Sequence, residues 1–195
     1  MTPASRPRMT RAELVALVRQ RHPEVELDGR LTVVGIRGYY RDTMGARGRN
    51  DRGIYDDALF IVAPDAFVAF NANTDPSRVR NGKGHGIGKG MATLKAGVWP
   101  VYRFDLHSGK YLALCQRAGP VTVLRDSAVG PYADTGMFGI NIHRGGRTTT
   151  GSEGCQTIPP DQWPAFIATA QDQAKRLFGD DWKGETLTYV LLEGV

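Results

Sequence analysis

The stretch ALFIVAPDAFVAFN, residues 58–71, is the clearest local structural signal in the first half of the chain. Its two apolar runs, 58–62 and 66–71, contain the aromatic and β-branched residues that favour strands. The segment Ala-Pro-Asp at 63–65 lies between them and has the composition of a tight turn. The stretch therefore predicts a β-hairpin, and it indicates that a sheet forms the framework of the fold.

Further short apolar runs on both sides of this hairpin are also predicted to be strands. They cover residues 31–36, 98–104, 111–116, 121–125 and 186–192. The turn-like segments 107–110 and 117–120 separate three of them, which predicts an antiparallel meander across residues 98–125.

Helical signals lie near both ends of the chain. Thr10 and Glu13 form a capping-box pattern that predicts a helix start, and His22-Pro23 ends that helix. A second helix is expected to begin with Asp161 as its cap and to end at Gly179. Its apolar residues recur at helical spacing: Trp163, Phe166, Ile167, Ala170, Ala174 and Leu177.

These elements predict an α+β, β-rich fold with a mainly antiparallel or mixed sheet, or a sandwich core. An N-terminal helix precedes the sheet, and one long C-terminal helix is followed by a last strand. Residues 1–9 are expected to be a flexible tail, and residues 10–195 are expected to form a single domain, a length that can bury a core of its own.

Composition narrows the class of protein. With 41% hydrophobic and 23% charged residues, the chain has the profile of an ordinary globular protein. The net charge of +5 suits a polyanionic partner, but a solvated basic surface explains it as well. The basic residues are scattered and no recognition motif occurs, so no nucleic-acid partner is expected. No run approaches the 18 apolar residues of a membrane span.

The stretch 139–157 carries the residues with the clearest potential for chemistry. Cys155 follows His143 by 155 − 143 = 12 positions, and glycines between them allow the chain to fold back. An imidazole next to a thiol can take its proton and so produce a nucleophile for acyl carbons. The hypothesis requires that the thiol be open to the medium and face the ring. Cys115 lies in an apolar run and is expected to be a core residue.

The pattern of Ile142-His143-Arg144-Gly145 followed by Ser152-Glu153-Gly154-Cys155 resembles the signature of the L,D-transpeptidase catalytic domain (YkuD-like) family. The resemblance covers about twenty residues, with a looser likeness in the β-rich region before them. It implies that Cys155 is acylated by a peptidoglycan stem peptide, that His143 is its base, and that Ser152 and Gly154 shape the oxyanion loop.

Several further roles follow from the same resemblance. Thr157 stands where the family usually carries an arginine, so Arg144 or Arg147 is the candidate for holding a substrate carboxylate. Asp134, which comes just before the strand that presents His143, is a candidate for orienting the imidazole, and a backbone carbonyl is the alternative. No cofactor is expected. The partner implied is a stem peptide or muropeptide.

The N-terminal segment lacks the apolar core of a signal peptide. We therefore expect the protein to be cytoplasmic as synthesised. An enzyme of the cell wall would then work on recycled fragments, or reach the periplasm or cell wall by lysis, as in phage, or by a dedicated secretion apparatus.

The glycine-rich segment 82–90 invites comparison with phosphate-binding loops. It has no Gly-x-Gly-x-x-Gly register, and neither Gly-Lys pair is followed by Ser or Thr. We interpret it as a loop that borders the active site, with His85 as a candidate substrate contact.

Two other functions compete with acyl transfer. A zinc peptidase would use some of His85, His107, His143 and Asp134, although no His-Glu-x-x-His motif occurs. A non-enzymatic binding module for cell wall or nucleic acid is the other alternative. His107 and the three acidic residues Asp56, Asp57 and Asp75 are interpreted as turn residues, the last three exposed to solvent.

Overall fold

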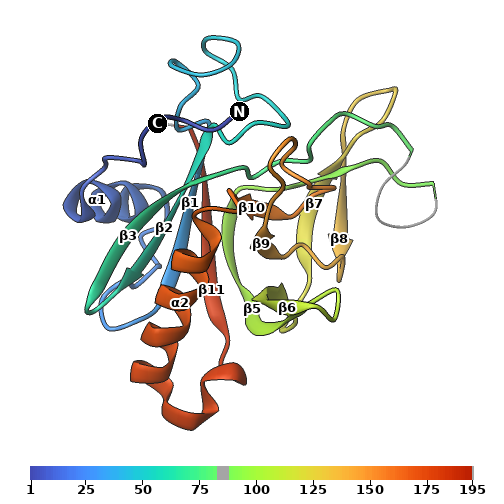
Figure 1. Cartoon of the computed structure of the whole chain (residues 1–195). Helices are drawn as coiled ribbons and strands as arrows, with labels where there is room; N and C mark the ends of the chain where they lie inside the picture. The colour runs from blue at the N-terminus through green and yellow to red at the C-terminus, as the bar shows by residue number, and fades with distance from the viewer. Residues whose placement is uncertain (83–87, 195) are drawn as a thin grey trace.

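The computed structural model describes residues 1–82 and 88–194 of the chain. Within them the chain forms one large mixed sheet, a small second sheet and helices near both ends (Figure 1). In chain order the elements are α1 (Arg11–Arg21), β1 (Thr32–Arg37), β2 (Asp57–Ala63), β3 (Ala66–Ala72), β4 (Ala92–Leu94), β5 (Gly97–His107), β6 (Tyr111–Gln116), β7 (Val121–Arg125), β8 (Tyr132–Gly136), β9 (Ile142–Arg144), β10 (Gln156–Ile158), α2 (Trp163–Phe178), the 3₁₀ helix η1 (Gly179–Lys183) and β11 (Leu187–Glu193).

The large sheet has the strand order β10-β9-β6-β5-β11-β1-β2-β3. The predicted hairpin is confirmed, because β2 and β3 pair antiparallel around the turn at 64–65. Two pairs in this sheet are parallel, β1 with β11 and β9 with β10. The α+β, β-rich class with a final strand after the C-terminal helix is therefore confirmed.

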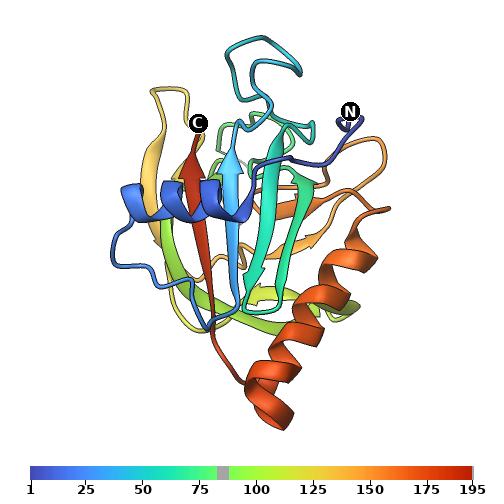
Figure 2. The same ribbon diagram turned by 90° about the vertical axis from the view of Figure 1, so that its left-hand side faces the viewer.

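Both faces of the large sheet are covered, which explains why β1 and β2 are buried along their whole length. Side chains alternate along a strand, so one strand supplies two cores. Val34, Phe60 and Val62 pack with Leu14 and Val18 of α1 on one face. The other face forms the larger core, to which α2 contributes Phe166 (Figures 1 and 2).

The expected antiparallel meander across 98–125 is only partly present. β5 and β6 form a hairpin, but β7 leaves the large sheet and pairs with β4 and β8 in a second sheet of order β4-β7-β8. The sequence did not predict β8, because its Asp134-Thr135-Gly136 segment has the composition of a turn. This segment is a strand because it pairs antiparallel with β7, although its own residues do not favour a strand.

The two ends of the strand order in the large sheet meet at one point. Asn73, just after β3, forms an isolated antiparallel bridge with Thr157 of β10. Their backbones exchange two hydrogen bonds of 2.8 Å, Asn73 N to Thr157 O and Thr157 N to Asn73 O. This bridge ties β10, and so the segment that carries Cys155, to the first hairpin.

The helix starts were predicted with mixed success. The capping box of α1 is confirmed, with Thr10 accepting from the Glu13 amide. Asp161 is not the cap of α2, because that helix begins after Gln162 and has no side-chain cap hydrogen bond. Gly179 ends α2 as expected. Among the described residues, neither helix combines the length and apolar composition needed to cross a bilayer.

The N-terminal segment, expected to be a flexible tail, makes contacts with the loop that follows β1. The Met1 carbonyl accepts a hydrogen bond of 2.9 Å from the Tyr55 amide. The Ser5 carbonyl accepts one of 2.9 Å from the Tyr40 hydroxyl.

Candidate active site

His143 lies on β9, and Cys155 comes directly before β10, which pairs parallel with β9. In the register of β9 and β10, His143 is opposite Thr157, and Cys155 immediately precedes β10. Side chains alternate along strands, so Cys155 shares a face with Asn141 and His143 rather than with Ile142. The fold therefore brings together two residues that are separated by the glycine-rich loop 145–151.

Cys155 is buried, with 9% of the residue's surface exposed, whereas the hypothesis requires a thiol open to the medium. Its Sγ accepts a hydrogen bond from the Asn141 amide (3.4 Å) and donates to the Gly139 carbonyl (3.4 Å). Burial raises the pKa of Cys155 from 9.0 to about 11, although the Asn141 amide favours the thiolate. The resting group is thus a neutral thiol.

The imidazole of His143 is also held neutral. The residue is 6% exposed, and its burial, with the neighbouring His107, lowers its pKa from 6.5 to about 4. Nδ1 lies 2.8 Å from the Arg144 carbonyl, so this nitrogen carries the proton and Nε2 keeps its lone pair. A backbone carbonyl therefore orients the ring.

No hydrogen bond joins Sγ of Cys155 to His143 among the described residues. Each group is engaged elsewhere, the thiol with Gly139 and the Nδ1 of the ring with Arg144. Long or absent catalytic hydrogen bonds are common in enzymes without substrate. Proton transfer from Cys155 to His143 would require the Cys155 side chain to rotate away from Gly139.

The loop before Cys155 is built around Ser152. Its hydroxyl donates to the Cys155 carbonyl (2.7 Å) and accepts from the Gly154 amide (3.0 Å). The Gly154 amide is thus occupied, whereas no hydrogen bond from the Cys155 amide occurs among the described residues. The Cys155 amide is therefore left available as a donor to an oxyanion.

Gly154 is required by a close approach of the backbone. Its φ is +157°, and a Cβ at this position would lie 2.4 Å from the carbonyl oxygen of Ala92 in β4. The glycine thus lets the loop pack on the second sheet, where the Ala92 amide donates to the Glu153 carbonyl (3.2 Å). The shape of this loop is therefore set by its contacts with β4, about sixty positions earlier in the chain.

The residues expected to bind substrate are found in different environments. Arg144 is exposed beside His143, and its guanidinium lies 5.1 Å from the centre of the Tyr111 ring. Arg147 is exposed in the loop after β9. Thr157 is fully buried and contacts Asn73, so its side chain does not reach a bound ligand in this conformation. His85 lies outside the described residues.

Asp134 does not orient His143 in this structure. Its carboxylate, in β8, forms ion pairs with Arg125 (2.6 Å) and Lys89 (2.7 Å), and it makes no hydrogen bond to the imidazole. These partners lower the pKa of Asp134, the Lys89 hydrogen bond most. Because Arg125 is fully buried, Asp134 has a structural role as its counter-ion.

The three acidic residues near β2 and β3 are not solvated turn residues. Asp56, Asp57 and Asp75 are all buried. Asp57 accepts hydrogen bonds of 2.5 Å from the amides of Gly38 and Thr74, and Asp75 pairs with the buried Arg37 at 3.3 Å. They thus fasten the loop after β3 to β1.

Nothing in residues 1–82 and 88–194 forms a group of three or more His, Cys, Asp and Glu that could hold a metal. Two candidate zinc ligands, His107 and His143, have their rings stacked face to face at 4.0 Å. Their Nδ1 atoms are engaged by Asn141 and by the Arg144 carbonyl. The described residues therefore do not support the zinc alternative.

The sequence did not identify three residues that surround His143. His107 was interpreted as a turn residue, but its ring stacks on that of His143. The hydroxyl of Tyr111 lies 3.3 Å from Nδ1 of His143. Asn141 contacts both Cys155 and His107. The available signal was the position of His107 and Tyr111 as a pair flanking a three-residue turn, 108–110.

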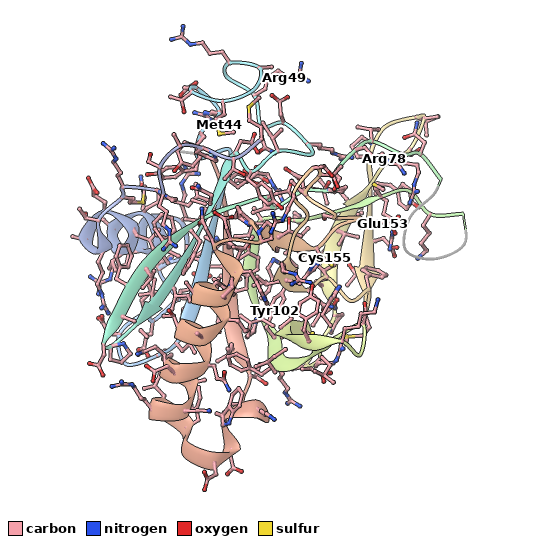
Figure 3. All side chains as sticks on the ribbon, in the orientation of Figure 1. Met44, Arg49, Arg78, Tyr102, Glu153 and Cys155 are labelled. Atoms are coloured by element: carbon pink, nitrogen blue, oxygen red, sulfur yellow. The ribbon has the colours of Figure 1, made fainter. Side chains whose placement is uncertain are left out.

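A pocket of about 360 Å³ borders the loop before Cys155. It is lined by Ser77, Arg78, Met91, Thr149, Gly151, Ser152 and Glu153. In Figure 3, Arg78 and Glu153 lie on the side of Cys155 that faces the second sheet. Thus the loop has Cys155 at its end and an open space on its flank.

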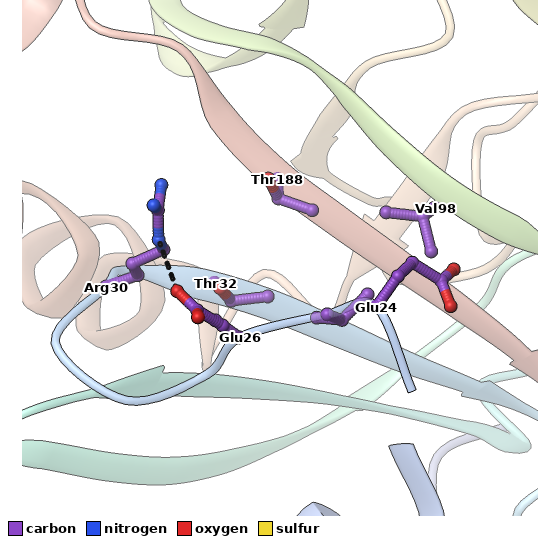
Figure 4. Close-up of a pocket in the computed structure, with 7 residues that line it drawn as sticks. Glu24, Glu26, Arg30, Thr32, Val98 and Thr188 are labelled. Atoms are coloured by element: carbon purple, nitrogen blue, oxygen red, sulfur yellow. Dashed lines mark ion pairs between the residues drawn. The ribbon is translucent and has the colours of Figure 1, made fainter. Parts of the chain in front are cut away.

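Another pocket, of about 250 Å³, lies at the start of β1 and is lined by Glu24, Val25, Glu26, Arg30, Thr32, Val98 and Thr188 (Figure 4). Its Val98 is near the start of β5, at the opposite end of this strand from His107. Glu26 and Arg30 form an ion pair of 3.9 Å in it. No cysteine or histidine of the described residues lines this pocket.

Neither protein-family models nor curated proteins give a match to this chain. The function is therefore inferred from the geometry of the site and from the resemblance of its motif.

Proposed function

We propose that the protein is a cysteine-dependent acyl-transfer enzyme that acts on peptidoglycan stem peptides, as an L,D-carboxypeptidase, L,D-endopeptidase or L,D-transpeptidase. The observation that carries the proposal is that Cys155 directly precedes β10, which pairs parallel with the strand of His143, while Nε2 of His143 is left as the basic nitrogen. The class of substrate comes from the resemblance of the motif.

The neutral state of both groups selects a general-base mechanism. A thiolate–imidazolium pair is disfavoured before substrate binds, because burial raises the pKa of Cys155 and lowers that of His143. The proton therefore moves from Sγ to Nε2 as the sulfur attacks.

The reaction has two stages, acylation of Cys155 and release of the acyl group. Sγ forms a bond to the carbonyl carbon on the L-side of an L–D peptide bond, and the Cys155 amide donates to the oxyanion. Collapse of this intermediate breaks the C–N bond, and protonated His143 returns its proton to the leaving amine. The thioester is then opened by water in hydrolysis or by an amine in transfer.

The proposal is tested by incubating the protein with purified muropeptides and identifying the products by mass spectrometry. Loss of a terminal D-Ala indicates carboxypeptidase action, cleavage within a longer peptide indicates endopeptidase action, and exchange with an added D-amino acid indicates transfer. Cys155→Ala is expected to abolish all three.

Cys115→Ala is the matched control, because Cys115 is the other cysteine and is fully buried, with its thiol 3.6 Å from the Asp105 carbonyl. It should keep the activity. Product formation that survives Cys155→Ala would contradict the proposal, and its loss on addition of a chelator would support the zinc alternative.

A further inference from the structure

His107 is held against the candidate base by a tight hairpin. It is the last residue of β5 and pairs with Tyr111, the first residue of β6. Ser108 and Gly109 between them have φ values of +51° and +69°, which allow the chain to reverse within three residues. β6 also pairs with β9, and this places the His107 ring next to that of His143.

The two imidazole rings form a parallel stack. Their centroids are 4.0 Å apart and their planes differ by 16°. One face of His143 is therefore covered by His107, which limits rotation of its ring and keeps water from that face. A positive charge on either ring would lie directly against the other ring.

Asn141 fixes which nitrogen of His107 is protonated. The backbone amide of Gln116 donates to Oδ1 of Asn141 (3.0 Å), which sets the orientation of the side-chain amide. Nδ2 of Asn141 then points to Nδ1 of His107 at 3.1 Å and must donate to it. Nδ1 of His107 is thus an acceptor, and a proton on it would face another donor.

The same residue also contacts the nucleophile. The backbone amide of Asn141 donates to Sγ of Cys155 at 3.4 Å. Asn141 therefore contacts both the Cys155 thiol and the His107 ring that covers His143. The other titratable or charged groups around the stack, among the described residues, are Tyr111 from β6 and Arg144 from β9, while α2 presents the uncharged Trp163 to Tyr111.

We propose that His107 is a positioning residue for His143: stacked on it and anchored by Asn141, it keeps the base neutral and oriented with Nε2 toward the thiol. The inference rests on the role of His143 as base for Cys155, but not on the identity of the substrate. His107 acts on the reaction through the ring of His143, on which it stacks.

The test measures the reactivity of Cys155 itself. The rate of its alkylation by iodoacetamide is followed by peptide mass spectrometry across the acidic and neutral pH range, in the full chain with Cys115→Ala as background. His107→Ala removes the stack, and His107→Phe restores a flat ring without ring nitrogens. His22→Ala is the matched control, because His22 lies at the end of α1 and contacts Glu24.

With His107→Ala, water reaches His143 and its titration moves from about 4 toward its ordinary value of 6.5. The neutral fraction of the base, and with it the alkylation rate, then falls about ten-fold at about pH 5.5. His107→Phe should recover most of that loss, and His22→Ala should change nothing. In ¹⁵N NMR spectra, His143 should be the Nδ1-H tautomer in the parent and a mixture in His107→Ala.

Asn141→Ala supplies a second, independent variant, because it leaves the backbone amide that contacts Cys155 in place. Without the side-chain amide, His107 loses the contact that fixes the orientation of its ring but keeps the stack on His143, so alkylation at acidic pH should lie between that of the parent and that of His107→Ala. Thermal melting of each variant identifies any that fail to fold, and the NMR spectra report the tautomer of those that do.

The outcomes separate this inference from the proposed function. If His143→Ala slows alkylation but His107→Ala changes neither the pH profile nor the ¹⁵N shifts, the inference is wrong and the Cys–His pair stands. If His107→Phe behaves like His107→Ala, a stacked ring does not keep His143 neutral, and the inference is also wrong. If His143→Ala has no effect on alkylation, the proposed function fails at the pair itself.

Discussion

Acidification should destabilise the protein through His143. The buried ring has a pKa of about 4 in the folded chain, against 6.5 for the ordinary group. A lowered folded-state pKa means that the unfolded chain takes up the proton first as the pH falls. The stabilisation is therefore complete above the ordinary pKa and is lost progressively between pH 6.5 and 4.

The magnitude follows from the two pKa values. The contribution of His143 to the free energy of unfolding falls by about 2 kcal/mol from about pH 7 to 5, and by about 3 kcal/mol from about pH 7 to 4. Removing the titrating group removes this dependence. In His143→Gln, unfolding should therefore lose less free energy on acidification than in the parent, by about these amounts.

Urea unfolding followed by tryptophan fluorescence at a series of pH values measures the effect. Asp56 and Asp57, whose pKa values are raised by burial, act in the opposite direction, since a raised acid loses stability as the pH rises. Asp56 and Asp57 are present in both the parent and His143→Gln, so their contributions cancel when the two unfolding free energies are subtracted. Parallel stability curves for the parent and His143→Gln would refute the reasoning, because His143 would then be solvated in the folded state.

Three further substitutions test the site. Gly154→Ala would bring a Cβ to 2.4 Å from a carbonyl oxygen of β4, so it should destabilise the chain by about 2 kcal/mol or more and lower Cys155 alkylation, as thermal melting and mass spectrometry would show. Ser152→Ala leaves the Gly154 amide without its acceptor and should cost about 1–3 kcal/mol in urea unfolding; an unchanged midpoint would contradict the loop structure. Asp134→Asn weakens the ion pair of the buried Arg125 and should lower stability by about 3 kcal/mol. It should leave the pH profile of Cys155 alkylation unchanged, whereas a shifted profile would restore Asp134 as a partner of the base.

The local elements were the easiest to predict from the sequence. The capping box at Thr10 and Glu13, and the Pro-Asp turn at 64–65, are set by residues within a few positions of each other, and both are found in the structure. The departure of β7 to a second sheet was not predictable in this way. Its outcome depends on pairing with β8, whose turn-like residues carry no strand signal of their own.

The site shows the same division. Cys155 and His143 were identified by residue type and spacing, and in the structure they belong to two segments that pair side by side, β9 and the start of β10. The neighbours of His143 come from β5 and β6, about thirty positions away, and only the pairing of strands brings them close. Asp134 had a plausible position before β9, but the buried Arg125 takes its carboxylate.

The placement of β11 has a consequence for the order of assembly. This strand is the last to be synthesised among the described elements, yet it lies inside the sheet between β5 and β1. Until it leaves the ribosome, β1 and β5 both expose unpaired backbone edges, which are sites for association with other chains. A nascent chain that stalls before residue 187 therefore holds two incomplete sheet fragments, and we expect it to depend on chaperones at that point.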